Sequence, residues 1–315
     1  MSTVRTPVMA DGLPTSLLAM LGPEIEILPW DDSPASPALS RAVGLITYGH
    51  PRADGPLMDR MPHLKIISNH GVGVDHIDCA AARERGIPVG NTPGCLDAAT
   101  ADMTMALLLA AARNVVSGDK FARSAAFTHY DPSFMIGYEV TGSTLGIIGL
   151  GRIGKQVAKR ARAFDMPILY HNRHRDEAAE RELGVKYASL DELLAQSDFV
   201  ALNCPLTPET TNLIGQRELA LMKRTAILIN VARGAVVDHD ALLAALKSKR
   251  IAGAALDVTS PEPLPRNHPL LGLDNLVIAP HLGSAANRTR RRMEEMTVLN
   301  LKAGLAGEAL PWRVA

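Results

Sequence analysis

Several features are scarce in this sequence, and each scarcity excludes a class of protein. Basic and acidic residues both number 33 among 315 residues, so no net charge favours nucleic acid or an anionic membrane as the partner. The 3 cysteines, Cys79, Cys95 and Cys204, are widely scattered and lack metal-ligand spacing. We therefore expect reduced thiols in a cytoplasmic protein, and no metal site.

Long apolar runs are also absent. The most apolar stretch, residues 105–112, is far too short to span a bilayer. The first residues lack a basic segment followed by an apolar run and a small-residue cleavage site, so no export signal is expected. With 47% hydrophobic and 21% charged residues, the composition is typical of a soluble globular enzyme or binding protein, and the length suggests two domains.

Short runs rich in Val, Ile and Leu alternate with segments of helical period, a pattern that predicts parallel strands joined by covering helices. The pattern occurs twice, so we expect an α/β protein with two doubly wound parallel-sheet domains. In the first set the predicted strands are residues 25–28, 43–48, 65–68 and 88–89, and the predicted helices are residues 14–21, 57–60 and 76–85. In the second set the predicted strands are residues 144–148, 167–170, 199–203, 226–230, 252–256 and 276–279, with helices at residues 152–164, 176–183, 190–195, 217–222 and 240–249.

Two further helices are predicted. Residues 97–116, "DAATADMTMALLLAAARNVV", form a helix that is apolar nearly all round, so most of its surface must be buried. Either a partner subunit or the rest of the same chain could cover it. The last helix, residues 284–305, is rich in Arg and Glu and could return to pack on the first domain.

A glycine-rich loop opens the second set. Gly149, Gly151 and Gly154 follow the predicted strand and precede a predicted helix, the context in which a G-x-G-x-x-G pattern indicates a dinucleotide site. The first glycine permits a tight turn, the second lets a pyrophosphate approach the backbone, and the third lets helix and strand pack closely. The first N–H groups of the helix would then face the phosphates. The alternative is a tight turn without a ligand.

The strand that follows this loop lacks the acid that an NAD site usually places at the strand end to bind the ribose hydroxyls. Residues 168–175 instead read "ILYHNRHR", and the first acid is Asp176, within a predicted helix. Arg173 and Arg175 stand where an adenosine 2′-phosphate would lie, and guanidinium groups suit a phosphate dianion. With Asn172 they are candidate cofactor-binding residues, and they favour NADP(H) over NAD(H). The alternative is a solvated basic loop.

Three residues suited to catalysis follow the ends of later strands: Arg233 in "NVARGAVVD", Glu262 in "SPEPLP" and His281 in "APHLGSA". Ligands of open α/β sheets bind at this edge. Arginine can pair with a substrate carboxylate and polarise its carbonyl, histidine can exchange a proton, and a carboxylate can orient the histidine. Each residue alone has a structural explanation, but together they form a candidate catalytic group.

A second loop with glycines, "NHGVGVDHID", spans residues 69–78. It lacks a third glycine, so we do not expect it to bind a nucleotide. Its backbone could expose the N–H groups of Val72 and Gly73 to a small carboxylate. A tight turn would explain the same residues equally well.

These segments, with "NTPGCLDAATADMTMALLLAAAR", "CPLTPETTNLI" and "AALDVTSPEP", resemble the D-isomer-specific 2-hydroxyacid dehydrogenases from about residue 60 to residue 285. The resemblance implies a Rossmann dinucleotide-binding domain, residues 99–284, inserted in a flavodoxin-like substrate domain, residues 1–98 plus 285–315. It implies a homodimer, with Arg233 binding the substrate carboxylate and carbonyl and with His281 as general acid/base partnered by Glu262. Val72 and Gly73 match the family's backbone carboxylate site.

The resemblance also implies cofactor contacts at the matching positions Thr100, Arg152, Ile153, Pro205, Val231, Asp257 and Gly283. Within the family, "LYHNRHR" is similar to the NADPH-preferring glyoxylate, hydroxypyruvate and 2-ketogluconate reductases. We therefore expect an NADPH-dependent reductase that converts small 2-oxo acids to D-2-hydroxy acids. The alternatives are a dinucleotide-sensing, corepressor-like interaction protein, and an enzyme that oxidises a one-carbon acid or phosphite.

Overall fold

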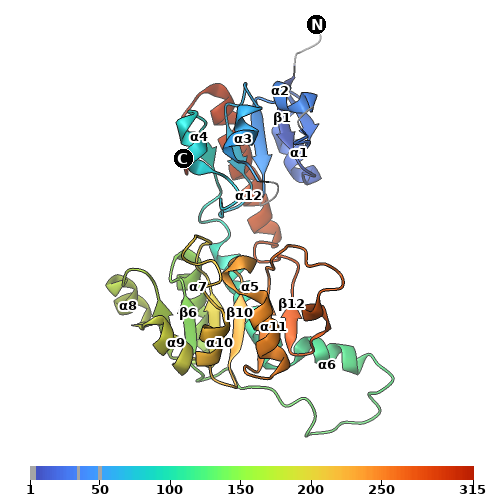
Figure 1. Cartoon of the computed structure of the whole chain (residues 1–315), viewed down its shortest axis with the longest axis vertical. Coiled ribbons are helices and arrows are strands. Elements are labelled where there is room, and N and C mark those ends of the chain that lie inside the picture. Colours follow the sequence, from blue (N-terminus) through green and yellow to red (C-terminus); the bar gives the residue numbers. More distant parts are fainter. Residues whose placement is uncertain (1–4, 34–35, 49–51) are drawn as a thin grey trace. The chain divides into compact units, whose positions relative to one another are not determined.

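The computed structural model describes residues 5–33, 36–48 and 52–315, and it divides the chain into two compact units (Figure 1). Unit 1 combines Met1–Leu96 with Ala286–Ala315, and unit 2 is Asp97–Ala285. The chain therefore begins unit 1, builds all of unit 2 and then completes unit 1. Each unit is built on one parallel sheet covered by helices, which confirms the predicted fold class.

Unit 1 has a five-stranded parallel sheet in the order β2-β1-β3-β4-β5. Its strands are β1 (Thr6–Ala10), β2 (Ile25–Pro29), β3 (Gly44–Thr47), β4 (Ile67–Asn69) and β5 (Val89–Gly90). Its helices are α1 (Thr15–Leu21), α2 (Pro37–Arg41), α3 (Gly55–Asp59), α4 (Cys79–Glu84) and α12 (Asn287–Ala306).

Strand β1 and the short helix α2 were not predicted from the sequence. Strand β1 is an interior strand of the sheet, between β2 and β3, yet its sequence contains Pro7, and a proline argues against a strand that pairs on both sides. Pro7 still takes part in the sheet through its carbonyl, which accepts a hydrogen bond from the Val43 N–H at 2.9 Å. The missing N–H is thus tolerated because the neighbouring residues of β1 pair on both sides.

Alternate residues of the central strands pack on opposite faces of the unit 1 sheet. Met9 and Leu45 belong to the core cluster that contains side chains of α2, α3 and α4, whereas Val8 and Ile46 belong to the cluster with α1 and α12. This is the period of two expected for strands buried on both faces. The last helix of the chain, α12, therefore covers the sheet with which the chain begins, as the sequence suggested.

Unit 2 has a seven-stranded parallel sheet in the order β12-β11-β10-β9-β6-β7-β8. Its strands are β6 (Leu145–Ile148), β7 (Ile168–His171), β8 (Lys186–Tyr187), β9 (Phe199–Leu202), β10 (Ile227–Asn230), β11 (Gly253–Leu256) and β12 (Leu276–Ile278). Its helices are α5 (Asp97–Ala112), α6 (Val115–Ala122), α7 (Arg152–Ala161), α8 (Glu177–Leu183), α9 (Leu190–Gln196), α10 (Gln216–Leu221) and α11 (His239–Lys247). The strand order reverses between β6 and β9, which is where open α/β sheets bind ligands.

Six of these strands were predicted, and β8 was not. Lys186 and Tyr187 are both exposed and form no apolar run, so β8 is recognisable only by its pairing with β7 at the edge of the sheet. Within the described ranges, no helix combines the length and the apolar content needed to cross a membrane.

The helix predicted over residues 97–116 is wrong at its end, because α5 stops at Ala112 and α6 starts at Val115. Between them Asn114 is left-handed, with φ of 53°, a conformation that asparagine tolerates better than most residues. Helix α5 packs on α7, β10 and β11 of its own unit. Burial within one chain therefore accounts for its apolar character.

Candidate active site

The three predicted catalytic residues follow adjacent strands at one edge of the unit 2 sheet. Arg233 comes after β10, Glu262 after β11 and His281 after β12, and these three strands are neighbours in the order β12-β11-β10. Because the carboxyl ends of parallel strands lie at the same edge, the sheet gathers segments that are up to about fifty residues apart in the chain.

His281 and Glu262 are in direct contact. Nδ1 of the imidazole lies 2.6 Å from Oε1 of Glu262, and Oε2 of Glu262 accepts a longer hydrogen bond, 3.3 Å, from the Thr259 N–H. The side chains are 48% and 28% exposed, so the pair is open to small molecules. With Nδ1 occupied by the carboxylate, Nε2 is the ring nitrogen that can exchange a proton with a bound molecule.

The backbone at His281 is left-handed, with φ of 57°, and Asp257 holds it there. The buried Asp257 carboxylate accepts hydrogen bonds from the Leu282 N–H at 2.6 Å and the Gly283 N–H at 2.7 Å, and its own carbonyl accepts from the His281 N–H at 2.9 Å. Burial raises the pKa of Asp257, while these two carboxylate hydrogen bonds act in the opposite direction. Asp257, predicted as a cofactor contact, thus positions the segment that carries His281.

Arg233 is held by the buried end of β10. The Asn230 side chain accepts from the Ala232 N–H at 3.0 Å and donates to the Arg233 carbonyl at 2.9 Å. The guanidinium donates to the Ala232 carbonyl at 2.8 Å. A Cβ on the next residue, Gly234, would collide with the Thr259 carbonyl, so the loops after β10 and β11 are in tight contact. The half-buried Arg233 therefore presents its guanidinium from a loop that is fixed by hydrogen bonds and close packing.

In the glycine loop between β6 and α7, the packing of the protein explains two of the three glycines but not Gly151. Gly149 has φ of +97°, and a Cβ there would lie 2.5 Å from the Cys204 N atom; a Cβ on Gly154 would collide with the Gly149 carbonyl. A Cβ on Gly151, in contrast, would meet no described atom within 4 Å. The space above Gly151, at the N-terminus of a ten-residue helix, fits a phosphate group from outside the chain.

Two asparagines lie at the ends of the strands next to β6: Asn172 follows β7, and Asn203 follows β9. The Asn172 side chain accepts from the Leu150 N–H at 2.7 Å, so this predicted cofactor residue also braces the glycine loop. Neither polar atom of the buried Asn203 amide, just after β9, has a hydrogen-bond partner among the described residues. A buried amide without partners is unusual, and it is consistent with a ligand group reaching this point. The residues present therefore fit a dinucleotide.

The other predicted cofactor positions lie along the same edge. Arg152 and Ile153 open α7, Pro205 follows β9, and Val231 follows β10. Thr100 belongs to α5 and lies close to Gly283: a Cβ built on Gly283 would be 3.4 Å from the Thr100 methyl carbon.

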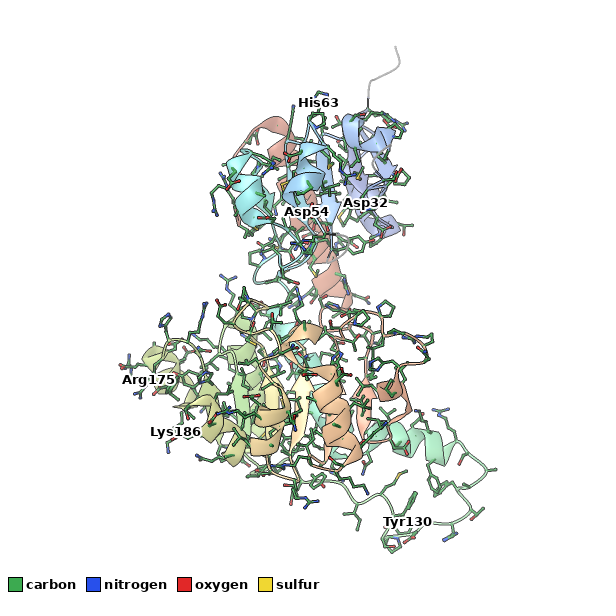
Figure 2. The ribbon with its side chains drawn as sticks, viewed as in Figure 1. Asp32, Asp54, His63, Tyr130, Arg175 and Lys186 are labelled. Carbon is green, nitrogen blue, oxygen red and sulfur yellow. The ribbon has the colours of Figure 1, made fainter. Side chains whose placement is uncertain are left out.

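The basic strand end after β7 is more structured than the sequence suggested. Arg175 makes two hydrogen bonds of 2.7 Å to Glu180 of α8, and Tyr170 donates to the same carboxylate. Glu180 has its pKa lowered to about 2, first by Arg175 and then by Tyr170. Arg173 is exposed and makes no short ion pair with any described residue. Figure 2 shows Arg175 at the surface of the unit, near α8.

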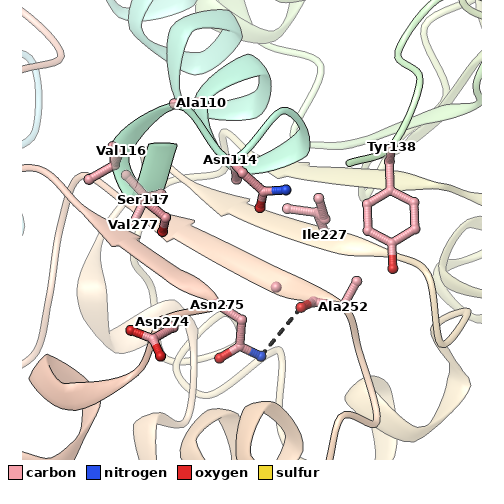
Figure 3. Close-up of a pocket in the computed structure, with 12 residues that line it drawn as sticks. Ala110, Asn114, Val116, Ser117, Tyr138, Ile227, Ala252, Asp274, Asn275 and Val277 are labelled. Atoms are coloured by element: carbon pink, nitrogen blue, oxygen red, sulfur yellow. Dashed lines mark hydrogen bonds between the residues drawn. The ribbon is translucent and has the colours of Figure 1, made fainter. Parts of the chain in front are cut away.

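A cavity at the opposite edge of the sheet is a poor candidate for the active site. It lies beneath α5 and α6, against the first residues of β10 and β11, and measures about 60 Å³ (Figure 3). This volume is much smaller than the roughly 300 Å³ of ordinary ligand pockets.

Val72 and Gly73, predicted to bind carboxylate, belong to unit 1, where they follow β4 and are half-buried.

Comparison with known proteins identifies the family. The family model of the D-isomer specific 2-hydroxyacid dehydrogenase NAD binding domain matches residues 105–283. A glyoxylate reductase of Pyrococcus horikoshii is 47% identical over 309 residues, which are 95% of this chain and 92% of that protein. The glyoxylate reductase of Korarchaeum cryptofilum is 51% identical over 82% of this chain and 78% of its own. This chain belongs to the D-isomer-specific 2-hydroxyacid dehydrogenase family.

Solved structures agree with this assignment to the 2-hydroxyacid dehydrogenases. The TT0316 protein of Thermus thermophilus is 47% identical, with a TM-score of 0.90 over 98% of this chain and 100% of its own. The NADPH-dependent glyoxylate/hydroxypyruvate reductase of Sinorhizobium meliloti, solved with NADP and malonate, is 32% identical, with a TM-score of 0.89 over 99% and 97% of the two chains. The protein is thus an oxidoreductase with a nicotinamide dinucleotide site, as the sequence predicted.

Asn203 and Asn230 lie at the same edge of the sheet and were not singled out from the sequence. Each follows four consecutive buried residues, in "FVALN" and "AILIN", so a polar amide at the end of an apolar run was the available signal. The signal was read only as the end of a strand. An amide that can neither ionise nor move far is suited to hold a backbone or a ligand at a strand end.

Replacing Gly151 by Ala should weaken dinucleotide binding about tenfold or more, equal to at least ~1.4 kcal/mol, without lowering the melting temperature. The added methyl group meets nothing in the protein but occupies the space assigned to the phosphates. Fluorescence titration with NADPH and NADH, alongside thermal unfolding, measures both effects. Gly154→Ala is the contrasting variant, because its methyl group collides with the backbone and should destabilise the fold. Unchanged binding by Gly151→Ala would contradict the phosphate site.

Proposed function

We propose that this dehydrogenase uses NADPH to reduce small 2-oxo acids to D-2-hydroxy acids. The observation that carries the proposal is the contact of His281 with Glu262 at 2.6 Å, at the same sheet edge as Arg233 and the glycine loop. A proton donor, a fixed cation and a dinucleotide loop on one edge are the parts that carbonyl reduction needs.

In this proposal the dinucleotide, when bound, supplies the hydride, and the chain supplies the proton and the orientation. His281 donates a proton from Nε2 to the oxygen of the carbonyl as charge develops there. Glu262 holds the opposite ring nitrogen and so fixes the tautomer and orientation of the ring. Arg233 pairs with the substrate carboxylate and polarises the neighbouring carbonyl. In the oxidative direction, His281 accepts the proton.

Glyoxylate and hydroxypyruvate are the proposed substrates, and 2-ketogluconate is a further candidate. Support comes from the names of similar proteins: the two archaeal relatives are glyoxylate reductases, and the Sinorhizobium meliloti enzyme is a glyoxylate/hydroxypyruvate reductase. Unit 2 is proposed as the dinucleotide-binding domain and unit 1 as the substrate domain. In unit 1, the proposal assigns carboxylate binding to the backbone at Val72 and Gly73.

NADPH is proposed over NADH because of the end of β7. No carboxylate stands directly after the strand, since Asp176 caps α8 and forms an ion pair with Lys155 at 2.7 Å. Arg173 is the exposed cation at this point, and Arg175 is held nearby by Glu180. The complex of the Sinorhizobium meliloti reductase with NADP supports the same preference. We assign the main phosphate contact to Arg173 and a supporting role to Arg175.

A homodimer is proposed from the segment between α6 and β6, residues 123–144, which is called the arm below. Large apolar side chains of the arm face solvent: Tyr130 is 80% exposed, Ile136 76% and Phe127 50% (Figure 2 labels Tyr130). Monomeric proteins rarely expose a group of large apolar side chains to solvent, and aromatic residues are typical of protein interfaces. A second copy of this chain is the proposed cover.

Replacing His281 by Ala should lower kcat for glyoxylate reduction by about a hundredfold to ten-thousandfold, the usual contribution of a general acid. NADPH affinity, measured by fluorescence titration, should stay near the wild-type value, because His281 acts on the substrate. His63→Ala changes an exposed histidine of unit 1 and serves as the control (Figure 2). A kcat close to wild type in His281→Ala would remove His281 from the proposed role.

Arg173→Ala combined with Arg175→Ala should raise KM for NADPH about tenfold or more and leave KM for NADH nearly unchanged, because only NADPH carries the phosphate. Of the single variants, Arg173→Ala should have the larger effect. Lys186→Ala, which removes an exposed cation from the neighbouring strand β8, is the matched control (Figure 2). Equal changes for both cofactors would mean that the basic stretch is a solvated loop.

Charged residues in the arm should separate the dimer. We expect Tyr130→Asp with Ile136→Asp to sediment as a monomer under conditions in which the wild type sediments as a dimer. Leu18→Asp, at an apolar residue of α1 that is 40% exposed, should leave the dimer intact. Sedimentation velocity measures all three proteins, and a monomeric wild type would refute the dimer.

A further inference from the structure

Two asparagine side chains hold the loop after β4, together with one backbone hydrogen bond from the Thr92 N–H to the Gly71 carbonyl at 3.0 Å. The Asn69 amide, at the end of β4, donates one hydrogen bond to the Gly71 carbonyl and another to the Gly73 carbonyl, both at 2.9 Å. Asn69 is only 1% exposed. Its Oδ1 has no hydrogen-bond partner among the described residues, so the amide hydrogens make all of its observed polar contacts.

A second asparagine, Asn91, donates to the carbonyl of Val72, which lies between Gly71 and Gly73 in the chain. Asn91 follows the neighbouring strand β5, and this side-chain hydrogen bond measures 2.9 Å. Asn91 is itself fixed: its N–H donates to the Trp312 carbonyl, and its carbonyl accepts from the Asn300 side chain at 3.0 Å. Three successive carbonyls of the loop are therefore directed at two amides on adjacent strands.

This arrangement decides where the N–H groups of the loop point. In a trans peptide the N–H is opposite to the C=O of the same peptide plane. The N–H groups of Val72, Gly73 and Val74 are therefore directed away from the two asparagines, and none of the three donates to another described residue. Residues 71–74 are only half-buried, so a small ligand can reach them. Successive N–H groups that converge outward form an anion-binding concavity.

The residue between Asn69 and this loop adds no charge of its own. His70 is buried, and its Nδ1 lies 3.0 Å from the Thr297 hydroxyl, which in turn donates to the Met293 carbonyl. Burial, assisted by the nearby charge of Arg290, lowers the pKa of His70 to about 4, so the ring is neutral near pH 7. His70 therefore supplies no charge to an anion at the loop, and the backbone N–H groups there can bind one without titrating.

We infer that Asn69 and Asn91 are positioning residues that hold the loop at residues 71–74 as a receptor for the substrate carboxylate. The inference rests on the proposed function, because the anion it concerns is the carboxylate of the 2-oxo acid. Neither asparagine touches the substrate in this scheme. Each acts by turning carbonyls away, so that the N–H groups of Val72, Gly73 and Val74 face the ligand.

The test compares Asn69→Asp and Asn69→Ala with the wild type in steady-state reduction of glyoxylate by NADPH. The Asp side chain keeps the size of Asn but offers only oxygens to the two carbonyls. It should turn the Gly73 carbonyl away, whereas the Thr92 N–H still binds the Gly71 carbonyl. We expect KM for glyoxylate to rise about tenfold or more, the effect of losing one charge-assisted hydrogen bond, with kcat and KM for NADPH within about twofold of wild type. Asn69→Ala should change KM in the same direction by less, and Asn91→Asp should resemble Asn69→Asp.

Asn275→Asp is the matched control, because Asn275 also donates to two carbonyls, at 3.2 and 3.3 Å. It lies in unit 2, at the sheet edge opposite the candidate active site (Figure 3). The variant should leave KM for glyoxylate unchanged even if it lowers the melting temperature. Equal losses of kcat in all variants, or an unchanged KM in Asn69→Asp and Asn69→Ala, would overturn the inference. If the wild type does not reduce glyoxylate, the proposed function fails. Calorimetric titration with malonate then tests the loop alone. Equal affinity of the wild type and Asn69→Asp for malonate would overturn the inference about the loop.

Discussion

The buried carboxylate of Asp257 is the constraint on which the candidate active site depends. Asp257 directly follows β11, and its carboxylate accepts from two successive N–H groups after β12, so it joins the ends of neighbouring strands. His281, one residue before these N–H groups, is thereby held in a left-handed conformation and directed to Glu262. A carboxylate hidden from water would cost free energy without such partners. Its burial depends on these hydrogen bonds, and the same bonds position the proposed catalytic pair of His281 and Glu262.

Asparagine does comparable work at the other strand ends. Asn230 holds the loop that carries Arg233, and Asn172 braces the glycine loop. In unit 1, Asn69 and Asn91 hold the loop at residues 71–74. Parallel strands leave backbone groups without partners where they end, and an amide can donate and accept there without charge. Both units thus use asparagine side chains to shape loops at strand ends, alongside the carboxylate of Asp257 in unit 2.

The fold was largely predictable, and its exceptions have physical causes. The apolar runs of β9, β10 and β11 and the glycines at 149 and 154 carry local signals that tertiary structure did not override. Strand β1 was missed because Pro7 disguises a central strand, and β8 because an edge pair of exposed residues needs no apolar run. The break in the long helix at Asn114 involves contacts with the arm, which lies further along the chain. The Tyr138 N–H donates to the Ala112 carbonyl, and the Asn114 side chain donates to the Met135 carbonyl.

The sequence alone determined which chemical groups are available: a glycine loop, a strand end without an acid, and an arginine, a glutamate and a histidine after later strands. These signals are local, because they depend on residue type, spacing and the period of a helix or strand. Only the tertiary structure decided how each group is used. Arg175 is bound to Glu180, Asp257 holds the backbone beside His281, and Asn69 turns the carbonyls of its loop. The reason is that a polar group chooses partners by distance and direction in space, and the sheet brings together residues that are far apart in the chain.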